Sequence, residues 1–205
     1  MTEAATWCLL VDHSFAAVEV GEVPPTEALL GAWPLSPDGG LGRFEVNTGY
    51  RPDRPGSSSD SVDAGVWLLL HRDAEPEQLQ LLLRDSTFDI AMNGDGLPLI
   101  VKSPDDVPCA IVATAEVHRR RISSPDWLRA DVEDLVALLA DGVDVLFNPG
   151  GDTCVRLLGD FVREVLSMDD EDIAVACRGF LDQGVGLLIE GSAAAGMPGG
   201  SPPPC

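Results

Sequence analysis

Two apolar segments set the class of fold: CAIVATA at residues 109–115 and VDVLF at residues 143–147. The first has no polar face, which is the pattern of a central strand that is covered on both sides. The second runs directly into the turn NPGG, after which we expect a helix from Asp152 to about Ser167. A strand, a turn and a helix in this order favour an α+β fold, in which helices pack against a mixed β-sheet.

Working outward from these segments, the chain alternates between short strands, turns and helices. Helices are expected near Ser61, with Asp60 or Ser61 as the N-cap, and at Pro76, because proline is favoured at the first helical position. A further helix, capped by Ser124 or Asp126, is expected to run to about Ala140. Strands are expected at residues 6–11, 87–92 and 97–102, a helical turn at 26–30, and a hairpin formed by 32–35 and 42–46 around SPDGG.

These elements divide the chain into four parts. An N-terminal strand and hairpin segment covers residues 1–60 and ends in a Pro/Ser/Gly-rich stretch at 50–61, which we expect to be a mobile loop or linker. The α+β core covers residues 61–166. A C-terminal extension covers residues 167–190 and is expected to hold a helix or a strand within 169–189. Residues 191–205 (GSAAAGMPGGSPPPC) are expected to form a disordered tail.

The charge balance excludes two classes of partner. The 205-residue chain carries 34 acidic and 13 basic residues, a formal net charge of -21. Such a field repels nucleic acid and anionic lipid, and it favours association with a basic protein. No apolar run approaches the roughly 20 residues of a membrane-spanning helix. The N-terminus lacks the pattern of a secretory signal. We therefore expect a cytoplasmic protein without membrane insertion.

The residues that could carry out chemistry are scattered. Three histidines (13, 71, 118) and five cysteines (8, 109, 154, 177, 205) show no metal-ligand spacing, and there is no HExxH or GxSxG motif. The acidic runs lack the EF-hand pattern and are interpreted as solvated charge. We therefore expect a non-enzymatic protein without a cofactor or a metal. One alternative stays open, a thiol nucleophile formed by Cys109 or Cys154 with a histidine that is distant in sequence.

Two local features are candidate binding sites. Arg119, Arg120 and Arg121 follow His118 and form the only cationic cluster, which can dock an acidic partner or pair with the protein's own carboxylates. Asn148, Gly150 and Gly151 form a glycine-rich turn before the helix expected at Asp152. Free N–H groups at such a helix start can bind an anion, although Asp152 or Thr153 can cap the same groups instead.

A series of short motifs runs from about residue 31 to residue 166. The motifs are, in order, GAW (31–33), GRF (42–44) with Asn47 and Tyr50, VDA (62–64), LRDS (83–86), SPDDVPC (103–109), Thr114-Ala115 with His118-Arg119, VDVL (143–146) and NPGG (148–151). This ordered series resembles a family of proteins associated with the type VII secretion system. Residues 97–166 also resemble the N-terminal domain of SseB-type (enhanced serine sensitivity) proteins.

The resemblance implies a pathway and no catalytic residues. Members of this family accompany systems that export small helical WXG-type substrates. We therefore expect a cytoplasmic accessory or adaptor protein that binds a protein partner, such as a secretion component or a substrate, through an exposed apolar patch rimmed by carboxylates. The alternative is a regulatory module that binds a small molecule or an anion at residues 148–153. The sequence does not fix the oligomeric state.

Overall fold

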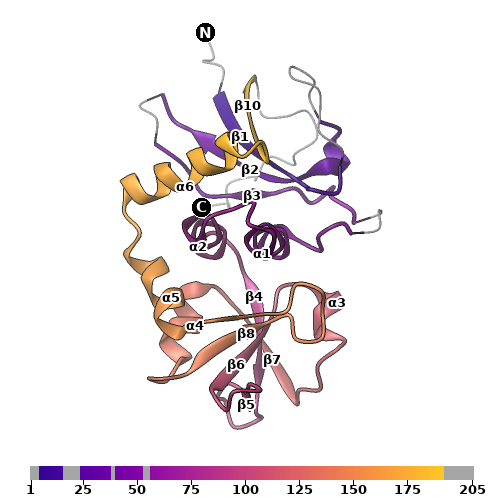
Figure 1. Cartoon of the computed structure of the whole chain (residues 1–205), viewed down its shortest axis with the longest axis vertical. Coiled ribbons are helices and arrows are strands. Elements are labelled where there is room, and N and C mark those ends of the chain that lie inside the picture. The colour runs from indigo at the N-terminus through magenta and orange to yellow at the C-terminus, as the bar shows by residue number, and fades with distance from the viewer. Residues whose placement is uncertain (1–4, 16–23, 38–39, 53–55, 192–205) are drawn as a thin grey trace, which may run out of the picture.

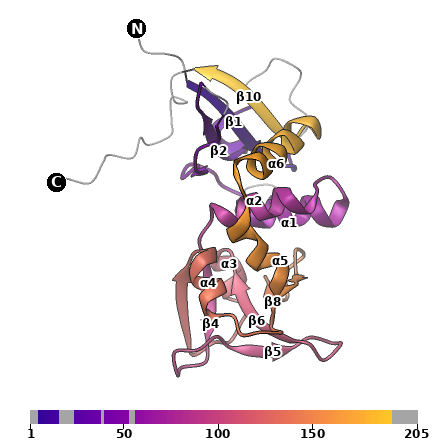
Figure 2. The same cartoon turned by 90° about the vertical axis from the view of Figure 1, so that its left-hand side faces the viewer.

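The computed structural model describes residues 5–15, 24–37, 40–52 and 56–191. They form two β-sheets, and the helices α1 (Ser61–His71) and α2 (Pro76–Arg84) lie between them (Figure 1). The side view shows the same layered order, with the helix pair between the sheets (Figure 2). The α+β class predicted from the sequence is therefore confirmed.

The first sheet combines both ends of the described chain. Its order is β10 (Gly186–Gly191), β1 (Ala5–Val11), β2 (Leu29–Leu35) and β3 (Glu45–Val46), and every pair is antiparallel. The short helix η1 (Thr26–Ala28) precedes β2, and α6 (Asp170–Asp182) packs on one face. Trp33 anchors this core, because its ring lies 4.5 Å from that of Phe44 and 5.5 Å from that of Phe180.

The second sheet is mixed, with β6 (Pro108–Ala113) at its centre. Its order is β7 (Asp126–Ala130), β4 (Phe88–Met92), β6, β8 (Asp144–Phe147) and β9 (Val155–Leu157), and β5 (Ile100–Lys102) also pairs with β6. Strands β6 and β8 are parallel and the other pairs are antiparallel. The central strand expected from residue 109 and the strand expected at 143–147 are both confirmed.

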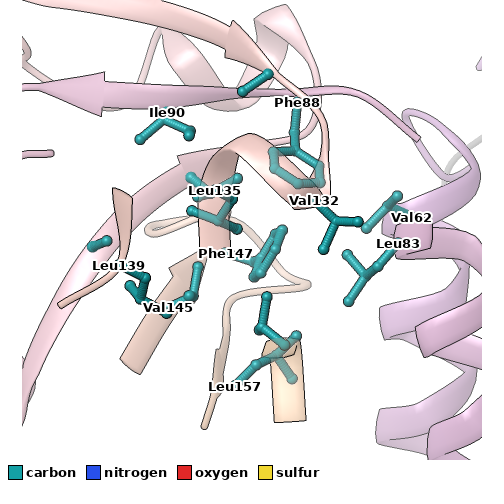
Figure 3. Packing of buried hydrophobic residues seen from close by; sticks show 14 of the residues in the cluster. Val62, Leu83, Phe88, Ile90, Val132, Leu135, Leu139, Val145, Phe147 and Leu157 are labelled. Carbon is teal, nitrogen blue, oxygen red and sulfur yellow. The ribbon is translucent and has the colours of Figure 1, made fainter. Parts of the chain in front are cut away.

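The core of the second sheet is built around two phenylalanines. Phe88 and Phe147 meet edge to face with ring centroids 5.8 Å apart (Figure 3). Helices α4 (Val132–Leu138) and α5 (Gly159–Glu164), followed by η2 (Val165–Ser167), pack over them. Val62 of α1 and Leu83 of α2 point into the same cluster, so the central helices form one wall of this core.

The central helices contribute to both cores. Val62 and Val66 of α1 belong to the core of the second sheet, whereas Ala64 and Leu68 belong to that of the first sheet. Gly65 permits the contact with α2, because a Cβ atom at this position would lie 2.6 Å from Leu82 Cδ1. A helix that is apolar on several sides needs burial on several sides. The two sheets are therefore held together through α1 and α2.

The starts of these helices are confirmed. Oδ1 of Asp60 accepts hydrogen bonds from the N–H groups of Val62 and Asp63, both at 2.9 Å, and so caps α1. Pro76 is the first residue of α2, behind a capping box formed by Glu75 and Gln78. The N-terminal hairpin is also confirmed, because β2 and β3 pair around the predicted turn.

Two predicted helices are wrong in their first halves. Residues 126–130 form β7, and α4 begins at Val132 behind the N-cap Asp131. Pairing of β7 with β4 overrides the helical periodicity, because β4 would otherwise expose an unpaired edge. The helix expected from Asp152 is replaced by β9, which pairs with β8 across the NPGG turn, and α5 begins only at Gly159.

The remaining expectations concern the linker and the C-terminus. Residues 169–189 hold both a helix and a strand, α6 and then β10, so the expected C-terminal extension joins the first sheet. The expected disordered tail lies outside the described residues apart from Gly191, which ends β10. In the expected loop at 50–61, Tyr50 is buried and its hydroxyl donates to Asp12 and, at 2.6 Å, to the carbonyl of Ser58.

Candidate functional site

The structure places the three candidate arginines in two different settings. Arg119 ends the short helix α3 (Glu116–Arg119), lies 3.3 Å from a carboxylate oxygen of Glu116 and stacks over the ring of Trp127 at 5.1 Å. Arg120 also pairs with Glu116, at 3.3 Å. These two arginines therefore pair with the protein's own carboxylates. Arg121 points elsewhere, because its Nη1 donates to Nδ1 of His118 at 3.1 Å.

Arg121 and His118 pack against the glycine-rich turn, so the two candidate sites are neighbours. A Cβ atom on Gly151 would lie 2.8 Å from Nη1 of Arg121 and 3.2 Å from Nδ1 of His118, so a larger residue there would require the Arg121 side chain to move. Gly150 has a positive φ of 78°, which glycine adopts without strain. However, no helix begins at this turn, so the dipole that would favour an anion is missing from it.

Asn148 uses its side chain inside the protein. It is fully buried, with a φ of 50°. Its Oδ1 accepts from the N–H of Thr114 at 3.0 Å, and its Nδ2 donates to Oγ1 of Thr114 at 3.1 Å and to Oδ1 of Asp63 at 3.4 Å. The turn is therefore tied to β6 and α1 by an amide group that is not available to a ligand.

Asp63 is the centre of a buried polar cluster, which we call the Asp63 cluster (Ser59, Asp60, Asp63, Thr114, His118, Asn148 and Thr153). Its carboxylate accepts from the N–H of Ser59 at 2.7 Å, from Oγ1 of Thr153, and from Asn148. Nε2 of His118 lies 3.5 Å away. Burial raises the pKa of Asp63, but the proximity of His118 and the hydrogen bonds from Ser59 and Thr153 outweigh burial and hold this pKa below its usual value.

The hydrogen bonds of His118 fix the direction of its protons. A guanidinium group has only donors, so Nδ1 of His118 must accept from Arg121 and the ring proton lies on Nε2. Nε2 then donates to Oγ of Ser59 at 2.9 Å, and this hydroxyl donates to Oδ2 of Asp60 at 2.9 Å. His118 therefore cannot accept the proton of Ser59 in this arrangement, and the contact is not a nucleophile–base pair.

The pKa of Asp60 is shifted in the opposite direction from that of Asp63. Burial and the nearby charge of Asp63 raise its pKa, although the surrounding hydrogen bonds oppose this shift. Its Oδ1 caps α1 and its Oδ2 accepts from Ser59, so both oxygens are occupied. The Asp63 cluster therefore fixes the start of α1 against the end of β6 and the 148–151 turn.

None of the four described thiols belongs to the Asp63 cluster, although Cys154 directly follows its member Thr153. Cys8, Cys109 and Cys177 are buried and Cys154 is exposed. A hydrogen bond with Cys177, together with burial, raises the pKa of Cys8, and burial raises that of Cys109. Within the described ranges, no hydrogen bond joins a cysteine to a histidine, and no group of ligand-type side chains is arranged to hold a metal ion.

A groove of about 540 Å³, which we call the acidic groove, lies between the N-terminal hairpin, α4, η2 and the start of α6. Its apolar lining comes from α4, η2, α6 and the N-terminal hairpin, and includes Leu41, Val132, Val165, Leu166, Met168 and Ile173. Leu166 is 46% exposed, so part of the lining faces solvent. Three carboxylates, those of Asp131, Glu133 and Asp170, also line it, and none of the described basic residues forms an ion pair with them.

Two arginines also line the acidic groove, and both pair with one buried carboxylate. Nη1 of Arg43 lies 3.0 Å and Nε of Arg84 lies 2.8 Å from Oδ1 of Asp85, whose side chain is fully buried. Asp85 offsets one of these two positive charges, and the three carboxylates in the lining leave the groove with a net negative charge. Sequence reasoning interpreted those residues as solvated charge and missed the groove, because its walls come from segments far apart in the chain.

Searches of protein-family models, of curated proteins and of solved structures found no match to this chain. No described helix has both the length and the apolar character that a bilayer crossing requires.

Proposed function

We propose that this protein is a non-enzymatic accessory or adaptor protein that binds another protein through the acidic groove. The observation that carries the proposal is the combination of the exposed Leu166 and the half-buried Leu41 and Met168 with three carboxylates that have no basic partner in the described structure. This combination fits the apolar patch with an acidic rim that the sequence predicts. Apolar contact supplies affinity, and the rim supplies selectivity and a faster encounter.

The occupant that fits is a short segment of a partner protein with apolar side chains flanked by lysine or arginine. Asp131, Glu133 and Asp170 would face the basic flanks, and Leu166 and Met168 would contact the apolar residues. The net charge of -21 increases the attraction at long range. Because exposed charges are screened beyond roughly 10 Å at 0.1 M salt, binding through this groove weakens as salt increases.

Type VII secretion is the pathway that we propose for this adaptor. Its support is the ordered series of motifs from residue 31 to residue 166, together with an α+β fold. The partner would then be a secretion component or a WXG-type substrate, met in the cytoplasm. Within this proposal the Asp63 cluster positions α1 and has no catalytic role.

The test is a binding measurement with purified type VII components. The export ATPase and WXG-type substrates are titrated against the full chain at about 50 mM and about 300 mM salt, where screening differs strongly. Glu133→Lys, Asp170→Lys and Leu166→Glu are each expected to weaken binding at low salt about fivefold or more. Asp95→Lys, in the exposed β4–β5 turn, is the matched control and leaves binding unchanged. Absence of binding at low salt, or equal loss in the control, rejects the proposal.

The alternative function is an anion-binding regulatory module at residues 148–153. One observation favours it. The side chain of Arg121 packs against Gly150 and Gly151 of this turn and also lines a pocket of about 370 Å³ together with Ser57 and Trp67. A thermal-shift series with phosphate and phosphorylated metabolites tests it. A shift that is lost in Arg121→Gln and kept in Arg120→Gln supports this module, and no shift with any ligand excludes it.

A further inference from the structure

A second cavity, of about 300 Å³, lies where the first sheet, the start of α1 and the second sheet meet. We call it the inter-sheet cavity. Leu30 and Val46 come from β2 and β3, Val62 from α1, Ser86 from the α2–β4 link, and Arg129 from β7. Arg51, five residues beyond β3, completes the rim. Cavities of this size that combine an apolar wall with a few polar groups are the usual form of small-molecule sites.

Ser86 is the first observation that points to a ligand at this cavity. The residue is 8% exposed, and its Oγ has no hydrogen-bond partner. A buried hydroxyl without a partner costs roughly 1–3 kcal/mol, and such groups are rare in folded proteins. Because the hydroxyl hydrogen of Ser86 can turn about the Cβ–Oγ bond, a ligand acceptor that reaches Oγ from the cavity would give this O–H a partner.

Two guanidinium groups at the same cavity supply the second sign. Nη1 of Arg51 donates to the carbonyls of Thr48 and Tyr50, at 2.8 and 2.7 Å, and Arg51 forms no ion pair with any described residue. Arg129 is held by Thr87 at 2.7 Å and by Asp89 at 3.3 Å. Both groups are therefore anchored at some of their nitrogens and keep other N–H donors for a carboxylate, which fits the planar fork of arginine.

The rest of the lining restricts the charge and shape of the ligand. Leu30, Val46 and Val62 form an apolar wall, and Val46 is 59% exposed. The carboxylates of Asp60 and Asp85 also line the cavity, so a ligand with several negative charges would be repelled. A single carboxylate on an apolar body can pair with Arg51, Arg129 and Ser86 and brings only one negative charge near Asp60 and Asp85.

We propose that the inter-sheet cavity binds a small organic monocarboxylate, with the carboxylate at Arg51, Arg129 and Ser86 and the apolar body against Leu30, Val46 and Val62. This goes beyond the proposed protein-binding function, because the site shares no lining residue with the acidic groove and needs no protein partner. Its test uses the full chain alone, so failure here leaves the groove proposal standing, and the reverse also holds.

The experiment is calorimetric titration with benzoate and hexanoate, using benzamide and inorganic phosphate as comparison ligands. The carboxylates are expected to bind with a Kd of about 1 mM or tighter, and benzamide and phosphate at least about tenfold more weakly. Arg51→Gln and Arg129→Gln are each expected to weaken benzoate about tenfold. Arg120→Gln, an exposed arginine outside the cavity, is the matched control and leaves binding unchanged.

Two further variants keep the test independent of folding defects. Ser86→Ala removes only the unpartnered hydroxyl and is expected to weaken benzoate while leaving the melting temperature of the free protein unchanged or higher. Val46→Trp fills the cavity from an exposed position on β3 and is expected to abolish binding. Equal affinity for benzoate and benzamide, preference for phosphate, or no heat with either carboxylate at about 10 mM overturns the proposal.

Discussion

Replacing Asp63 by asparagine removes the negative charge on which the Asp63 cluster converges. The side chain is 8% exposed and accepts hydrogen bonds from Ser59, Asn148 and Thr153. Asparagine has nearly the same shape, but one of its two terminal atoms is a donor, so at least one of these donors loses its acceptor. A hydrogen bond to a charged group contributes about 1.5–3 kcal/mol, and a buried donor left unpaired costs about 1–3 kcal/mol more. We therefore expect a loss of about 3 kcal/mol in the free energy of unfolding.

Urea unfolding at pH 7 measures this loss, and it corresponds to a fall in Tm of roughly 6–12 °C for a chain of this size. The pKa of Asp63 is lowered in the folded state. Its stabilising contribution is therefore complete above the unfolded value of about 3.9 and disappears as the pH falls through the folded pKa. The difference between wild type and Asp63→Asn should shrink over that acidic range.

Two controls isolate the charge. Asp95→Asn, in an exposed turn, is expected to change stability by no more than about 0.5 kcal/mol. Thr153→Val removes one donor to Asp63 and leaves the carboxylate, so its cost is expected to be about 1 kcal/mol. If Asp63→Asn unfolds within about 0.5 kcal/mol of the wild type at pH 7, the cluster does not stabilise the start of α1 as argued here.

Three further predictions follow from other contacts. Phe147→Ala empties the centre of the second core and should cost about 3–5 kcal/mol, measured by urea unfolding; a loss below about 1 kcal/mol would contradict the packing around Phe88. In a Cys205→Ser background, iodoacetamide should label Cys154 first, because Cys8, Cys109 and Cys177 are buried and the pKa of Cys8 and of Cys109 is raised. Fast labelling of Cys109 would instead support the alternative of a thiol nucleophile. Burial lowers the pKa of His13, whose ring stacks on that of Trp67 at 3.5 Å. The unfolded chain therefore binds more protons near and below pH 6.5, and the free energy of unfolding should fall as the pH drops through that range. His13→Gln should flatten this part of the stability profile, and an unchanged profile would reject the assignment.

The elements that the sequence predicts well are those with local chemical signals. Asp60 and Pro76 mark helix starts through capping and through a fixed φ, and these effects act within one turn of helix. The apolar run from Cys109 likewise has only one good environment, the middle of a sheet. Residues 126–140 mislead, because their helical periodicity is real, yet the first five residues gain more from pairing with β4. That gain depends on a strand about forty positions earlier in the chain, which no local window contains.

The candidate sites show the same limit. His118 and Arg121 meet Gly151, and Asp63 meets Thr153, across 90 positions in the second case, so spacing along the chain does not reveal these contacts. The sequence marks Arg119, Arg120 and Arg121 as equivalent, but Glu116 pairs with the first two and only Arg121 reaches the turn. The acidic groove and the inter-sheet cavity could not be predicted from the sequence for a related reason. Their lining residues form no motif within any one segment and come together only in the folded chain.

Asp85 is the residue through which the acidic groove and the inter-sheet cavity are physically connected. Its buried carboxylate accepts from Nε1 of Trp33 and from the N–H of Phe44, both at 3.1 Å, and also binds Arg43 and Arg84. Those two arginines line the groove, whereas Asp85 itself lines the cavity. A buried carboxylate with four such partners holds the N-terminal hairpin to the end of α2, because separating them would leave its charge unpaired. The width of the groove and the shape of the cavity therefore depend on the same ion-pair cluster.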